Sequence, residues 1–268
     1  MSELAKWYVV HTYSGYENSV AANILKAAEN RKMQDLIQEV YEQKELKQRA
    51  ELKQLQEQIN PHFLYNTLEC IRGQALMDGN TSVADMLEAL GNFFRYSISR
   101  RENVVTLADE INNIRSYMLI QNYRFLNRYR FELEFLEDEE PLLGCYVPKL
   151  TLQPIVENAL IHGFQNQKSG CVTLTVDASD SMLMLTVSDD GEGMDAAVLE
   201  ELNRKIQSRQ TLLRKPASHG NGIALQNVNR RIMMLYGRSY GLHAYSTPGR
   251  GTDVEIILPR ITKAEVTP

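Results

Sequence analysis

In the first half of the chain, apolar residues recur every three or four positions, which is the spacing of one face of a helix. This spacing predicts three helices, over residues 63–77, 82–100 and 106–126. Thr106 is expected to cap the third helix, because Asp109 follows three positions later and completes a capping box. Another helix is predicted upstream, over residues 41–58, which are rich in Gln, Lys and Glu. Residues 41–130 are therefore predicted to form an all-helical domain.

A short apolar stripe, Leu52, Leu55 and Ile59, runs along the upstream helix. It extends over little more than one heptad, so it fits either weak coiled-coil pairing of two chains or a solvated helix with a short buried edge. Pro61 lies further along the same helical run. Because proline lacks an N–H and its ring crowds the preceding turn, we expect a bend next to His62.

From residue 130 onward, apolar and polar residues alternate, which predicts strands. The alternating apolar positions are Phe131, Leu133 and Phe135, then Val172, Leu174 and Val176, then Leu183, Leu185 and Val187. Helices are predicted over residues 150–162, 196–208 and 222–236, closing strands over 240–246 and 252–258, and a hairpin turn over 177–181. Helices on one face of a mixed sheet make the predicted fold class α+β. The two-layer α/β sandwich is expected to extend over residues 131–262, with a tail at 263–268.

Five short motifs stand in order along these elements. They are Gln-Ile-Asn-Pro-His-Phe-Leu-Tyr-Asn at 58–66, Pro-Ile-Val-Glu-Asn-Ala-Leu-Ile-His-Gly at 154–163, Asp-Asp-Gly-Glu-Gly-Met at 189–194, His-Gly-Asn-Gly-Ile-Ala-Leu at 219–225 and Thr-Pro-Gly-Arg-Gly-Thr at 247–252. Each glycine-rich motif alone is weak, but their order and spacing together are specific.

The last four motifs are similar to the N, G1, G2 and G3 boxes of the ATPase superfamily that also holds DNA gyrase, Hsp90 and MutL. From about residue 41 to residue 260 the chain resembles the core of a LytS/YesM-like sensor histidine kinase. The resemblance implies a homodimer that phosphorylates His62 from ATP and passes the phosphoryl group to an aspartate of a response regulator, which controls transcription. Two alternatives remain open: an ATP hydrolase of the same superfamily that uses Glu157 on water, and a non-enzymatic transcription factor.

The resemblance also assigns the nucleotide site. Asp189 is expected to accept a hydrogen bond from the adenine amine, while Gly191 and Gly193 let the chain turn close to the base. Asn158 offers an oxygen ligand for Mg²⁺ held with the phosphates, and its neighbour Glu157 is expected to orient water or a proton.

The remaining nucleotide contacts are expected further along the boxes. His162 lies one helical turn after Asn158, where it either touches phosphate or packs before Gly163. Gly220 and Gly222 open a helix whose amino terminus suits a triphosphate. Leu225 and Thr252 complete the set, although the Thr252 box is expected mainly to support the fold. Residues 207–219 are predicted to form a mobile lid.

His62 is the predicted phosphoacceptor, because neutral imidazole is a nucleophile at physiological pH. Asn66 is expected to orient its ring. Phe63 occupies the position at which many other histidine kinases carry an acid, so the general base is unassigned. Further residues match the resembled group and are predicted to have a structural role: Arg95, Tyr96, Glu110, Tyr117, Gln121 and Arg124.

Residues 1–40 do not fit this organisation. Lys6 to Glu17 and the helix after it resemble the opening of the amino-terminal domain of the transcription factor NusG, and the likeness stops near Val40. The segment is expected to be a fusion or assembly scar, with an accidental resemblance of a natural leader as the alternative. We assign it no function.

Composition adds limits to this interpretation. At 268 residues and 43% hydrophobic composition the chain can form two compact units, and its formal net charge of −5 disfavours direct binding of nucleic acid. No stretch approaches the roughly 18–20 apolar residues of a membrane span. The chain as written is therefore expected to be cytoplasmic, whereas full-length relatives would reach the membrane through a sensor region that is absent here.

Overall fold

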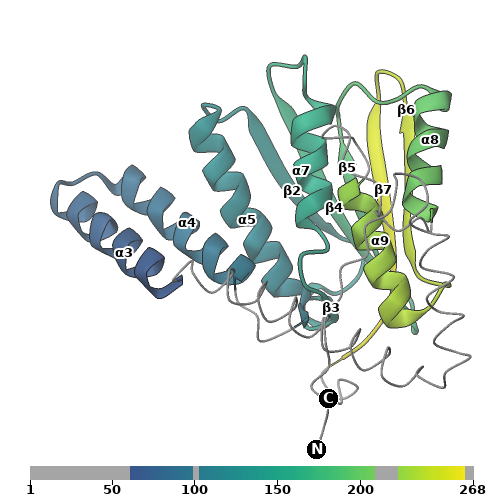
Figure 1. Ribbon diagram of the computed structural model, residues 1–268, viewed down its shortest axis with the longest axis horizontal. Helices are drawn as coiled ribbons and strands as arrows, with labels where there is room; N and C mark the ends of the chain where they lie inside the picture. Colours follow the sequence, from purple (N-terminus) through teal and green to yellow (C-terminus); the bar gives the residue numbers. More distant parts are fainter. Residues whose placement is uncertain (1–60, 99–102, 209–222, 263–268) are drawn as a thin grey trace, which may run out of the picture. The chain divides into compact units, whose positions relative to one another are not determined.

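A computed structural model of the chain describes residues 61–98, 103–208 and 223–262 (Figure 1). The helix predicted over residues 41–58, its apolar stripe, the bend before His62 and the NusG-like segment lie outside the described residues. Most of the predicted lid at 207–219 also lies outside them.

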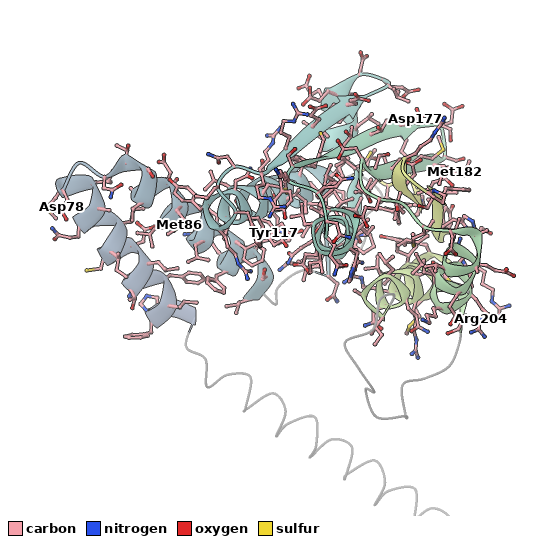
Figure 2. The ribbon with its side chains drawn as sticks, turned by 90° about the horizontal axis from the view of Figure 1, so that it is seen from above. Asp78, Met86, Tyr117, Asp177, Met182 and Arg204 are labelled. Carbon is pink, nitrogen blue, oxygen red and sulfur yellow. The ribbon has the colours of Figure 1, made fainter. Side chains whose placement is uncertain are left out.

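The first described elements are two helices joined by a short turn, α3 (Pro61–Met77) and α4 (Thr81–Ile98). Gly79 has a φ of 72°, a left-handed conformation that glycine adopts without strain and that ends α3. The side chain of Asn80 accepts a hydrogen bond from the N–H of Val83 at 3.2 Å and so caps α4. Figure 2 shows Asp78 at this turn.

The third helix, α5 (Leu107–Arg124), begins where the sequence predicts. The Thr106 hydroxyl accepts from the Asp109 N–H at 3.2 Å, and the Asp109 carboxylate accepts from the Thr106 N–H at 3.1 Å. This reciprocal pair confirms the capping box. Buried α5 side chains belong to the same hydrophobic core as the strands: Leu107, Ile111, Ile114, Tyr117 and Met118. The predicted domain boundary at residue 130 stays a prediction.

A five-stranded mixed sheet follows, in the order β2-β4-β5-β7-β6 (Figure 1). Its strands are β2 (Tyr129–Phe135), β4 (Gly170–Ala178), β5 (Met182–Asp189), β6 (Gly241–Thr247) and β7 (Gly251–Pro259). β2 pairs with β4 in parallel, and the other neighbours are antiparallel. Figure 2 shows Asp177 and Met182 at the end of the predicted β4–β5 hairpin.

Helices cover one face of this sheet, which confirms the α+β sandwich. They are α7 (Gln153–Asn158) with its π-helical extension η1 (Ala159–Gly163), α8 (Ala196–Gln207) and α9 (Ile223–Tyr236) (Figure 1). The strand residues that face them are buried and apolar, as the alternation predicts: Val172, Leu174, Val176, Leu183, Leu185 and Val187. The opposite face of β4 and β5 carries Thr173, Thr175, Thr186 and Ser188, which are only partly buried.

Three short elements were not predicted: β1 (Val104–Thr106), α6 (Glu139–Leu143) and β3 (Tyr146–Pro148). β1 and β3 pair with each other as a separate antiparallel ribbon. A strand of three residues is too short to show alternation, so pairing across about 40 intervening residues gives no sequence signal. No helix of the described residues is long and apolar enough to span a bilayer.

The predicted helix over residues 150–162 needs a correction. It begins at Gln153, because Leu150 has a φ of 59° and the N–H groups of residues 150–152 bond to the Glu110 carboxylate instead of a preceding turn. Its last turn, which carries His162, is π-helical. Such turns commonly occur at functional sites.

Thr106→Ala tests the capping box. The substitution removes one half of the reciprocal pair at the start of α5, so we expect a loss of about 1 kcal/mol in the free energy of unfolding, measured by urea denaturation. Ser116→Ala is the matched control, because among the described residues its hydroxyl bonds only to the Asn112 carbonyl, within the same helix. An equal loss in both variants would contradict the capping role.

Candidate nucleotide-binding site

The ends of β5 and β7, together with α7, η1, α8 and α9, enclose a cavity of about 480 Å³. Its lining includes predicted residues from all four ATPase-like boxes: Asn158, His162, Asp189, Gly193, Leu225 and Thr252. These residues span almost a hundred positions of sequence, yet the fold brings them to one hollow. A second hollow of about 540 Å³ along α5 and β2 is lined by none of them.

The turn after β5 forms one wall of this cavity. Asp189 is the last residue of β5, and its Oδ1 accepts from the Gly191 N–H at 3.0 Å. Gly193 has a φ of 66°, and a side chain there would collide with the Thr247 carbonyl. A side chain at Gly163 would come within 2.9 Å of Asp189 Oδ1. The glycines therefore let three chain segments approach around one carboxylate.

Burial controls the charge of this carboxylate. It raises the pKa of Asp189 to about 6, and the hydrogen bonds from Gly191 and Thr252 act against the rise. Asp189 is therefore mostly ionised at pH 7, and it is partly protonated near pH 6. An ionised carboxylate at the cavity wall accepts hydrogen bonds only, which suits an amine donor on a ligand.

The helix α7 and its π-helical turn form a second wall. Asn158 ends α7, and its Nδ2 is buried without a hydrogen-bond partner in the described part of the chain. A buried amide without a partner is costly unless a ligand satisfies it. His162 lines the same wall, and partial burial lowers the pKa of its imidazole, so the neutral form predominates at pH 7.

The sequence did not identify the contribution of α8. Ala197, Glu201, Leu202 and Lys205 of α8 line the cavity, with the Lys205 Nζ 3.5 Å from a Glu201 carboxylate oxygen. An amphipathic pattern predicts the helix itself, but its charged residues resemble those of any solvated face. Only the tertiary structure shows that this edge of α8 faces the cavity.

Some predicted site residues do not line the cavity. Glu157 accepts a hydrogen bond from the Gln153 side chain at 2.7 Å and is not among the lining residues. Gly191 is likewise absent from the lining, although it holds Asp189. Gly220 and Gly222 lie outside the described residues, and α9 begins at Ile223, directly after them.

His62 and Asn66 lie one turn apart on α3, and neither lines the cavity. Both side chains are exposed, and the Asn66 Nδ2 is 3.3 Å from the His62 Nδ1. This contact matches the expected orienting role of Asn66. The described residues around the cavity thus include a carboxylate that can accept a hydrogen bond, while an exposed imidazole lies on a separate helix.

Comparison with known families agrees with this arrangement. Residues 50–129 match the family described as histidine kinase, and residues 148–262 match the family described as histidine kinase-, DNA gyrase B- and HSP90-like ATPase. Residues 5–67 match transcription termination factor nusG, so this likeness runs past residue 40 and overlaps the histidine kinase match.

Several individual proteins are similar to this chain. The sensor histidine kinase YesM of Bacillus subtilis is 35% identical over 85% of this chain, and the sensor protein LytS of Bacillus anthracis is 33% identical over 81%. The chain spans only 37% and 35% of the length of these relatives. Among solved structures, the histidine kinase domain of a blue-light activated kinase from Erythrobacter litoralis aligns with a TM-score of 0.41 at 18% identity, over 79% of this chain and 91% of that one.

Both matched segments, the helical one and the ATPase-like one, carry a histidine kinase description. Over residues 50–129 and 148–262, the chain belongs to the histidine kinase family, with YesM and LytS as similar proteins.

Proposed function

We propose that the chain carries the core of an ATP-dependent sensor histidine kinase, which phosphorylates its own His62 and passes the phosphoryl group to an aspartate of a response regulator. The observation that carries the proposal is the convergence of residues from four separate boxes on one cavity. The cavity would supply the site for ATP. His62, which is exposed on α3, would supply the acceptor.

Asp189 would select adenine. Its ionised carboxylate accepts a hydrogen bond from the exocyclic amine, whereas guanine presents a carbonyl oxygen at the corresponding position and would be repelled. The apolar lining near this residue, including Val187, Leu202 and Leu225, suits the faces of a planar base.

Asn158 would hold the metal that accompanies ATP. The buried Asn158 Nδ2 has no hydrogen-bond partner among the described residues. Rotation of the side-chain amide, which would turn Oδ1 toward a cation, therefore breaks no described hydrogen bond of Nδ2. A Mg²⁺ ion held there would neutralise phosphate charge during transfer. Neutral His162, one turn further along the same wall, would donate a hydrogen bond to a phosphate oxygen without adding charge.

His62 would act as the nucleophile. Rotation of the Asn66 amide would present its oxygen to the His62 Nδ1–H, which leaves the lone pair on Nε2. The Nε2 lone pair attacks the γ-phosphorus, an N–P bond forms, and the bond to the oxygen bridging the β-phosphate breaks. ADP leaves with that electron pair, and the ring proton is then released to water. Catalysis would rest on positioning and charge neutralisation.

The full-length protein is proposed to work as a homodimer, with a response regulator that controls transcription as its partner and a sensor region at the membrane. The ATP hydrolase alternative would place Glu157 on an attacking water. In the described residues this carboxylate bonds to Gln153 at 2.7 Å and lies outside the cavity lining, so the structure gives that alternative no support. We propose for Glu157 only the orientation of water or a proton.

Incubation of the chain with γ-labelled ATP tests the proposal directly. The expected product is a protein label that is lost in acid and retained in base, as for phosphohistidine. Release of labelled phosphate without any labelled protein would favour the hydrolase instead.

His62→Ala should abolish this label while the dissociation constant for ATP changes by no more than a factor of a few, because the acceptor does not line the cavity. His243→Ala is the matched control, since this exposed β6 histidine contacts only Tyr245 among the described rings. Acid-labile label retained in purified His62→Ala protein would refute the assignment.

Asp189→Asn should weaken ATP binding by roughly 1.5–3 kcal/mol, because an amide replaces an acceptor that carries charge. In the wild-type chain, affinity should also fall as the pH is lowered through about 6, since protonation removes the carboxylate. The Asn variant should lack this additional pH dependence. Calorimetric titration checks both effects, with Asp190→Asn as the control because this exposed neighbour does not line the cavity. If Asp189→Asn and Asp190→Asn bound ATP with equal affinity and equal pH dependence, Asp189 would not be the residue that binds adenine.

Asn158→Ala should weaken binding of Mg²⁺-ATP more than binding of metal-free ATP, because its proposed role is metal coordination. Titrations with and without EDTA measure the difference. Asn112→Ala, an exposed change on α5, serves as the control. If Asn158→Ala lowered both affinities equally, a folding defect would explain the loss and the metal role would be rejected.

A further inference from the structure

Glu110 is a fully buried carboxylate that the phosphoryl-transfer chemistry described above does not use. Its Oε1 accepts from the Leu150 N–H at 2.5 Å, and its Oε2 accepts from the N–H groups of Thr151 and Leu152, both at 2.8 Å. The Tyr96 hydroxyl on α4 also donates to Oε1. All of these partners are donors, so the ionised carboxylate is the form that the surroundings satisfy.

The three N–H groups belong to the turn that leads into α7. No side chain of this turn caps α7. Glu110 on α5 instead accepts from the N–H of the N-cap residue Leu152, the bond that the N3 side chain makes in a capping box, and from the two N–H groups before it. Leu150 has a φ of 59°, a conformation that is unfavourable for a residue with a side chain. Arg231 on α9 donates to the Leu150 carbonyl at 2.8 Å, so the strained residue is held from both sides. We call Glu110, the turn 150–152 and Arg231 the Glu110 network.

Two helices that line the nucleotide cavity, α7 and α9, contact this network. Asn158 ends α7, the helix that starts directly after the turn, and Leu225 lies on α9, six residues before Arg231. Because a rigid helix transmits a shift from one end to the other, a change in the turn would displace the Asn158 amide. α4 joins the network through Tyr96, and the Lys149 ammonium lies 4.9 Å from the centre of the Tyr96 ring.

We propose that Glu110 is a positioning residue that sets the Asn158 amide in the nucleotide site, and that Tyr96 links this setting to α4 and thereby to the helical hairpin that carries His62. The proposal rests on the proposed function, because Asn158 and His62 matter only if the chain binds Mg²⁺-ATP and transfers its phosphoryl group. Glu110 touches no ligand in this scheme and acts through the turn.

Glu110→Gln tests the first half of the proposal by calorimetry on the full chain. The amide keeps the acceptor at Oε1 but presents an NH₂ to the N–H groups of Thr151 and Leu152. We expect Mg²⁺-ATP to bind about 10- to 100-fold more weakly, the usual cost of losing a residue that orients a metal ligand. Metal-free ATP should lose at most about threefold on the same reasoning. Equal losses, or no loss, would overturn the positioning role.

A second variant separates positioning from stability. Leu150→Gly removes the strain at a φ of 59°, because glycine adopts this conformation readily. If Glu110 acts by holding the turn, Leu150→Gly in the Glu110→Gln background should restore part of the Mg²⁺-ATP affinity. The free energy of unfolding, measured in urea, reports the separate loss of the buried interaction. The comparison covers Glu110→Gln, Leu150→Gly and the double variant. If their Mg²⁺-ATP affinity simply changed in proportion to their free energy of unfolding, the proposal would be contradicted.

Tyr96→Phe tests the link to α4. The three N–H bonds to Glu110 remain, so the dissociation constant for Mg²⁺-ATP should stay within about twofold, while the rate of His62 labelling at saturating ATP falls about tenfold or more. Tyr123→Phe is the matched control: its hydroxyl also joins α5 to α4, through Ser82, but does not touch Glu110. Similar slowing by both variants would show that α4–α5 packing alone matters and would overturn the link.

Calorimetry and His62 labelling together distinguish the proposed kinase function from the proposed positioning role of Glu110. A wild-type chain that binds Mg²⁺-ATP but labels no histidine would refute the proposed function and with it the Tyr96 link. The calorimetric comparison would still decide whether Glu110 positions Asn158.

Discussion

A buried carboxylate is costly unless every lone pair that it presents finds a donor, and Glu110 meets this condition with partners from α4 and from the turn before α7. Burial raises the pKa of Glu110, and the hydrogen bonds from Tyr96 and the turn 150–152 oppose the rise. A hydrogen bond to such a charged group typically contributes about 1.5–3 kcal/mol to stability. The position of α4, α5 and the start of α7 therefore depends on one side chain.

The same constraint shapes the start of the ATPase-like region. Leu150 accepts an unfavourable backbone conformation because Glu110 binds its N–H and Arg231 binds its carbonyl. Without these contacts, the helical pattern of the sequence would favour a helix that starts earlier. The observed start at Gln153 fixes which residues of α7 face the cavity. Here tertiary contacts override local preference.

Close packing of the backbone constrains the chain around Asp189, as the hydrogen bonds of Glu110 constrain the start of α7. Gly163, Gly191 and Gly193 allow the turn after β5 to lie against η1 and β7, and Gly249 N–H donates to the Glu192 carbonyl at 2.6 Å. The G3-like box thus supports the turn, as the sequence predicts, while Thr252 from the same box also lines the cavity. A carboxylate enclosed in this way retains a raised pKa and a remaining capacity to accept hydrogen bonds.

By itself, the sequence determined the elements whose signal is local and repeated. The period of apolar residues located α3, α4 and α5 and the strands of the sheet, and Thr106 with Asp109 marked a helix start to the residue. The resemblance of the boxes to a known ATPase superfamily pointed to many of the residues that line the cavity.

Only the tertiary structure decided the features that depend on distant partners. The β1–β3 ribbon, the parallel β2–β4 pair, the π-helical turn with His162 and the contribution of Lys205 have no signature in a local window of sequence. Glu110 shows the reason most clearly. In the sequence it is one of two acids on its helix, and only the family resemblance indicates a structural role for it. What that role is becomes clear only when folding buries Glu110 against N–H groups that lie 40 or more residues away.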